Sequence, residues 1–99
     1  MSNFLGKVGP PSSTTFQIYR MKITDVVLAH TDFVSEFVVH DIVKFVNNVA
    51  IFRNGQLLFN GKNFSEENNN PVEVYPNGNN IRFAFDLLKG DTIQIITGG

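Results

Sequence analysis

The chain has 99 residues, 42% of them hydrophobic, and its 8 basic and 9 acidic residues leave a net charge of -1. This size and composition predict one domain with a substantial core, and no basic stripe of the kind found in nucleic-acid-binding proteins is present. The lack of cysteine excludes a disulfide framework or a thiolate metal site, and no apolar run approaches the ~20 residues needed to cross a bilayer. Because Gly6 and Pro10-Pro11 interrupt any signal sequence, we expect a soluble, near-neutral domain without nucleic-acid or membrane partners.

Residues 1–15 differ in composition from the rest of the chain, since Gly, Pro and Ser dominate them. The pair Pro10-Pro11 excludes a helix and favours an extended path. We therefore expect an extended arm over residues 1–15 and a folded domain over residues 16–99. Two alternatives remain open: the arm folds back on its own domain, or it clasps a neighbouring subunit. In both cases its contact residues are the apolar ones, which a solvated tail does not need: Phe4, Leu5 and Val8.

The sequence of the first half of the folded domain predicts two strands. Residues 16–28 fit a long strand with a bulge near Thr24-Asp25, where the apolar alternation slips. Residues 33–39 fit a second strand, whose same-face positions are Phe33, Ser35, Phe37 and Val39. Residues 41–46 fit either a short strand or a single helical turn.

Asn-Gly dipeptides occur three times in the second half of the folded domain, at Asn54-Gly55, Asn60-Gly61 and Asn77-Gly78. Asn and Gly reach positive φ at low cost, which the primed two-residue hairpin turns require. The runs between these turns predict strands over residues 49–53, 56–60, 72–76, 81–85 and 92–97, with Gly90 in a left-handed conformation before the last. About seven strands at this spacing predict an all-β fold, a single antiparallel β-sandwich or small barrel.

Metal sites have little support in the sequence. His30 and His40 flank the 33–39 strand and could approach each other in a hairpin, but no third ligand has a fixed position, so we expect no metal. Asp86 and Asp91 flank the Leu87–Gly90 turn. A turn-capping role for them is favoured over calcium binding, because the spacing of a calcium loop is absent.

Catalytic motifs are also missing. The chain contains no Cys, no Gly-x-Ser-x-Gly elbow and no phosphate-binding loop, so we expect no enzyme activity and no cofactor. The ten Phe residues raise the possibility of a stacking platform for sugars or bases. However, Phe33, Phe37, Phe83 and Phe85 have the same-face spacing of core residues.

Several short motifs resemble a module of tailed-bacteriophage structural proteins. They are the run from Ala50 to Leu58 with its Asn54-Gly55 turn, then Asn63-Phe64, Ile81-Arg82-Phe83, and Leu88 to Ile93 with Gly90-Asp91. The chain departs from the module at Asn63-Phe64, where Asp-Tyr is usual, and in the longer loop over residues 65–70. The match covers about half of the chain.

This resemblance implies a virion localisation and a non-enzymatic structural role. Partners would be the major capsid protein, other virion proteins and copies of the same chain. A small capsid decoration or cement protein is preferred, because fibres are usually long chains of many modules. A neck, baseplate or tail-fibre adaptor is the alternative. A carbohydrate-binding surface-recognition module is a second alternative, which would show an exposed aromatic side chain at the loop over residues 65–71 or 77–80.

Overall fold

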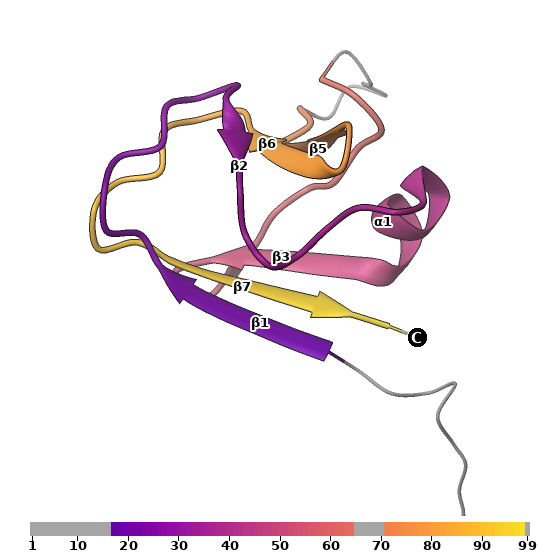
Figure 1. The fold of residues 1–99 in the computed structure, drawn as a ribbon, viewed down its shortest axis with the longest axis horizontal. Helices are drawn as coiled ribbons and strands as arrows, with labels where there is room; N and C mark the ends of the chain where they lie inside the picture. The colour runs from indigo at the N-terminus through magenta and orange to yellow at the C-terminus, as the bar shows by residue number, and fades with distance from the viewer. Residues whose placement is uncertain (1–16, 65–70, 99) are drawn as a thin grey trace, which may run out of the picture.

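The computed structural model of the chain describes residues 17–64 and 71–98, and their seven strands form two antiparallel sheets (Figure 1). The four-stranded sheet has the order β1-β7-β3-β4, with β1 at Gln17–Lys22, β7 at Thr92–Thr97, β3 at Val49–Arg53 and β4 at Gln56–Leu57. The three-stranded sheet has the order β2-β6-β5, with β2 at Asp32–Phe33, β6 at Asn80–Phe83 and β5 at Val74–Asn77. The predicted all-β fold is confirmed, and these two sheets form an open sandwich rather than a closed barrel.

One hydrophobic core lies between the sheets, because alternate residues of each strand point inward. The four-stranded sheet contributes Ile51, Ile93 and Ile95, and the three-stranded sheet contributes Phe33, Val74, Ile81 and Phe83. The rings of Phe33 and Phe83 meet edge to face with their centroids 5.5 Å apart. Phe37 is buried as well, and Phe85 is half-buried against Phe83. The predicted core role of these phenylalanines is therefore confirmed.

A short helix, α1 (Ile42–Asn48), closes one end of the sandwich (Figure 1). It begins where Asp41 accepts hydrogen bonds from the backbone N–H groups of Val43 and Lys44, which satisfies two N-terminal donors. Phe45 points from this helix into the core and is almost completely buried. Of the two predictions for residues 41–46, the helical turn is the right one.

Several predicted strands are shorter than expected. The strand over residues 56–60 reduces to β4, and the strand over residues 81–85 ends with β6 at Phe83. The strand over residues 16–28 is β1 alone, followed by an isolated bridge between Val27 and Leu87. The strand over residues 33–39 reduces to β2, and the backbone of Val39 instead bonds Asn79 in the β5–β6 turn. Burial at alternate positions explains the error, since irregular backbone can present alternating side chains to a core without forming a ladder.

The three Asn-Gly dipeptides have different roles. Asn54 and Gly55, with φ values of 51° and 86°, form the predicted two-residue turn between β3 and β4. In the second hairpin the turn residues are Gly78 and Asn79, one position later than predicted. Gly90, with φ of 96°, is left-handed as predicted.

The prediction of a hairpin turn at Asn60-Gly61 is wrong. Asn60 forms a parallel bridge with Val74, and its side-chain amide donates to the carbonyl oxygen of Val49 at 2.8 Å. Gly61 is buried, and a Cβ atom there would lie 2.5 Å from Cγ2 of Val72. This dipeptide is instead a packed junction on the chain segment that leads from the four-stranded sheet to the three-stranded sheet.

Two predicted features lie outside the described residues: the arm with Phe4, Leu5 and Val8, and the loop over residues 65–70. Within residues 17–64 and 71–98, no helix is long and apolar enough to span a membrane.

Candidate functional site

The outer face of the four-stranded sheet carries two rows of side chains that run across its strands. In the first row Ile18 pairs with Ile96, which pairs with Ala50. In the second row Arg20, Gln94, Phe52 and Leu57 follow one another across β1, β7, β3 and β4. Side chains directly opposite each other in an antiparallel sheet lie on the same face, so each row forms a continuous surface.

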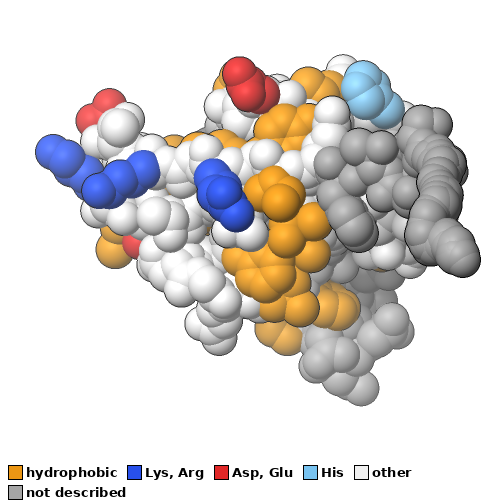
Figure 2. Space-filling model, turned by 90° about the horizontal axis from the view of Figure 1, so that it is seen from below, with side chains coloured by type: hydrophobic (Ala, Val, Ile, Leu, Met, Phe, Trp, Pro, Cys, Tyr) orange, Lys and Arg blue, Asp and Glu red, His pale blue; other side chains and the backbone are white. Residues whose placement is uncertain are grey.

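Apolar side chains on this outer face are open to solvent on both edge strands, β1 and β4. Ile18 is 52% exposed and Leu57 is 59% exposed, although both lie in regular strands. Figure 2 shows the face directly, with a continuous band of hydrophobic side chains across it and Lys and Arg side chains beside the band. Contiguous apolar surface of this kind typically marks an interaction site. We refer to Ile18, Ala50, Phe52, Leu57 and Ile96 as the apolar face.

The charged side chains on the outward strand positions of this sheet have one sign. Arg20 and Lys22 project from β1 on the outer side of the sheet, because Tyr19 and Met21 pack against the core. None of the nine described outward positions carries a carboxylate: Ile18, Arg20, Lys22, Ala50, Phe52, Leu57, Thr92, Gln94 and Ile96. A partner with acidic groups around an apolar contact would therefore complement this surface.

The outer face of the three-stranded sheet is polar and internally paired. Arg82 on β6 donates to Asp32 on β2 at 2.8 Å, and Asn77 on β5 donates to the same carboxylate oxygen at 3.0 Å. The hydrogen bond from Arg82, assisted by the one from Asn77, lowers the pKa of Asp32 below its usual value. The pair Asp32–Arg82 is partly exposed and stabilises the fold only modestly.

An aromatic cluster of His30, Phe64 and Tyr75 lies next to this polar network. His30 Nδ1 is 2.7 Å from the Tyr75 hydroxyl, and the His30 ring meets that of Phe64 edge to face at 4.6 Å. His30 has a left-handed φ of 62°, which is uncommon for a residue other than glycine. Phe64, predicted as an anchor beneath the loop, packs against His30 and Tyr75 but remains 53% exposed. Across the described residues, no group of three His, Asp or Glu side chains is placed to hold a metal ion.

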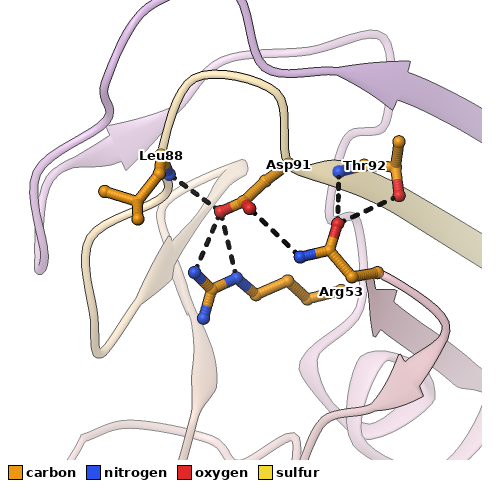
Figure 3. Close-up of polar contacts among 5 residues, drawn as sticks. Arg53, Leu88, Asp91 and Thr92 are labelled. Carbon is orange, nitrogen blue, oxygen red and sulfur yellow. Dashed lines mark hydrogen bonds and ion pairs between the residues drawn. The ribbon is translucent and has the colours of Figure 1, made fainter.

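Asp91 accepts hydrogen bonds from three residues, and its role is structural (Figure 3). It accepts hydrogen bonds from the backbone N–H of Leu88 at 2.8 Å and from the side chains of Asn54 and Arg53 at 3.1 Å. These contacts, led by the bond from Leu88, lower the pKa of Asp91. The predicted turn-capping role of Asp91 is confirmed. Asp86 instead bonds a distant segment, where its carboxylate accepts from the backbone N–H of Ala29 at 2.8 Å.

Comparison with known proteins gives no match: no family model, no curated protein and no solved structure resembles this chain closely enough to be matched to it.

The apolar face was missed by the sequence reasoning, although a signal for it exists. Consecutive apolar residues occur inside strands at Ile51-Phe52 and Ile95-Ile96, and at the end of β4 at Leu57-Leu58. Neighbouring residues of a strand point to opposite faces, so an adjacent apolar pair predicts apolar side chains on both faces of the sheet.

Proposed function

We propose that this chain is a non-enzymatic structural protein of a tailed-bacteriophage virion, which attaches to the particle through the apolar face. The observation that carries this proposal is the apolar face: Ile18, Ile96 and Ala50 form a row across β1, β7 and β3, and Phe52 and Leu57 continue the apolar surface on β3 and β4. Ile18 and Leu57 are more than half exposed. The second support is the resemblance of the run from Ala50 to Leu58 and of Gly90-Asp91 to virion modules.

Many copies of the chain on one particle would make a weak contact sufficient for attachment. A face of five apolar residues buries too little surface for tight binding by one copy. On a symmetric particle, many copies held at neighbouring positions bind with much greater avidity than one copy. A rigid sandwich with one apolar outer face suits such a role.

Within this proposal we prefer a small capsid decoration or cement protein, with the major capsid protein and neighbouring copies as partners. A neck, baseplate or tail-fibre adaptor is the competing position. Mass spectrometry of separated heads and tails distinguishes them, because a decoration protein is recovered in high copy number with heads. Its absence from both fractions of gradient-purified virions would contradict the proposal as a whole.

The arm adds a second test. Deletion of residues 1–15 is expected to abolish particle association and to leave the far-UV circular dichroism of the β domain unchanged. If the truncated chain still bound particles at full occupancy, the arm would have no role in attachment.

A second candidate function is carbohydrate recognition, and one observation favours it. Phe64 directly precedes the loop over residues 65–70 and presents a half-exposed aromatic ring beside His30 and the polar groups of the three-stranded sheet. Exposed aromatic rings with hydrogen-bonding neighbours are suited to stacking on sugars. A glycan array with the purified chain tests this function, and Phe64→Ala should abolish any specific signal. The matched control is Phe59→Ala, which removes an exposed ring from a residue outside the cluster.

A further inference from the structure

Strand β1 is an edge of the four-stranded sheet, and β7 is its only neighbour among the described strands (Figure 1). The backbone N–H of Ile23 donates to Asp91, and the carbonyl oxygen of Ile23 accepts from Gly90, so Ile23 faces the β7 side. Backbone groups alternate in direction along an antiparallel strand. The N–H and C=O groups of Ile18, Arg20 and Lys22 therefore point away from β7, toward the free edge.

A groove with a volume of about 590 Å³ runs along this free edge. One wall is β1 with the residues that follow it, and the other wall is the segment over residues 33–36. Beyond Phe33 that segment is not in a strand, so it forms no ladder with β1. Val34, on this second wall, is 76% exposed. Among the described residues, the groove thus combines backbone groups that have no strand partner with an apolar side chain, as in sheets that bind an extended peptide by adding a strand.

The charges around the groove determine which peptide strand would be complementary to it. An added strand places alternate side chains on the outer face, directly beside Ile18, Arg20 and Lys22, where opposite charges stabilise and like charges destabilise. Its remaining side chains enter the groove, where Val34 favours apolar groups and the carboxylates of Asp25 and Glu36 disfavour acidic ones. The complementary strand is amphipathic, with carboxylates outward and apolar side chains inward.

A second copy of β1 does not meet this requirement. Antiparallel pairing of two β1 strands would bring Arg20 and Lys22 of both copies onto one face without a carboxylate to compensate them. Basic side chains on an edge strand oppose this kind of self-association.

We propose that the free edge of β1 receives an extended segment of a partner protein, which pairs with Ile18, Arg20 and Lys22 and presents carboxylates to Arg20 and Lys22. This inference rests on the proposed function, since it specifies how a partner that contacts the apolar face continues the four-stranded sheet.

Three fluorescent nine-residue peptides test the proposal by anisotropy with the full chain at physiological ionic strength. One alternates Val and Glu, the second alternates Val and Lys, and the third is the Val-Glu peptide with alternate backbone amides methylated. We expect the Val-Glu peptide to bind at least 10-fold more tightly than the other two. Equal binding of the first two peptides, or no binding of any, would overturn the proposal.

A charge-reversal variant provides a second test. The variant Arg20→Glu/Lys22→Glu should lose the Val-Glu peptide and gain the Val-Lys peptide, which a misfolded variant could not do. The control Lys44→Glu/Lys89→Glu has the same net charge and should retain the original preference. Displacement of the Val-Glu peptide by a peptide of residues 1–16 at lower concentration would instead assign the edge to the chain's own arm and overturn the proposal.

The two proposals fail in different ways. If Leu57→Glu abolishes particle attachment while the Val-Glu peptide does not bind, the apolar face stands as the docking surface and strand addition is excluded. If the peptide binds but Leu57→Glu attaches normally, the edge is a binding site and the apolar face is not needed for attachment.

Discussion

The two outer faces of this sandwich differ in whether their side chains bond one another within the chain or remain exposed to solvent. On the three-stranded sheet, Asp32, Arg82 and Asn77 bond one another, and Tyr75 lies in hydrogen-bonding distance of His30. On the four-stranded sheet, apolar side chains such as Ile18 and Leu57 remain exposed. The first face is stabilised within the chain, whereas the second gains most from contact with another molecule. This difference identifies the surface on which a partner would be stabilising.

The largest expected effect is on attachment through the apolar face. The double variant Ile18→Glu/Leu57→Glu should weaken particle binding by on the order of 100-fold, because each large apolar side chain is worth ~1.5–3 kcal/mol when fully buried. Co-sedimentation with purified particles measures the loss. Leu88→Glu is the matched control, since Leu88 is similarly exposed but lies outside both outer faces.

A smaller effect, on the stability of the fold, is expected from a substitution at the junction between the sheets. Gly61→Ala places a Cβ atom against the buried Val72 and should destabilise the fold by about 1–3 kcal/mol. Urea denaturation followed by Tyr fluorescence and by far-UV circular dichroism measures this change. Coincident transitions would show that both faces belong to one cooperative unit, while separate transitions would show that each sheet unfolds alone.

The polar outer face of the three-stranded sheet should make the free energy of unfolding depend on pH in the acid range. The folded-state pKa of Asp32 is lowered, so the unfolded chain binds more protons around pH 4 and stability rises with pH there. This stabilisation is complete above the unfolded pKa of Asp32 and is lost as the pH falls through its lower folded pKa. Asp91 contributes in the same direction.

Thermal melts between pH 2 and pH 6 test this component. Asp32→Asn should flatten the dependence of Tm on pH relative to the natural chain. An unchanged slope in Asp32→Asn would mean that the polar face does not stabilise itself through this carboxylate.

The smallest expected effect is on the stability of the isolated chain when the apolar face is altered. Leu57→Thr keeps a β-prone residue and removes exposed apolar surface, so the free energy of unfolding should change by no more than about 0.5 kcal/mol. A loss of more than 1 kcal/mol in urea denaturation would show that Leu57 serves the fold rather than a partner.

The sequence predicted those parts of the fold that local rules determine. Asn54-Gly55 and Gly90 require positive φ, and the β-prone run over residues 92–97 predicts β7 in full. Asn60-Gly61 misled the prediction because its role depends on distant residues. Asn60 bonds Val49, and Gly61 allows the close approach of Val72.

The site was harder to predict because it depends on strand order. Ile18, Ile96 and Ala50 are far apart in sequence and meet only because β7 lies between β1 and β3. The aromatic cluster of His30, Phe64 and Tyr75 similarly needs tertiary structure to form. The apolar residues of the arm could be identified from the sequence, but their partner could not.

Hydroxyl-radical footprinting of the chain, free and on intact particles, tests the central claim most directly. The account predicts that Ile18, Phe52 and Leu57 become protected on the particle while Phe64 and His30 remain as reactive as in the free chain. Protection of Phe64 and His30 with unchanged reactivity of Ile18, Phe52 and Leu57 would contradict it.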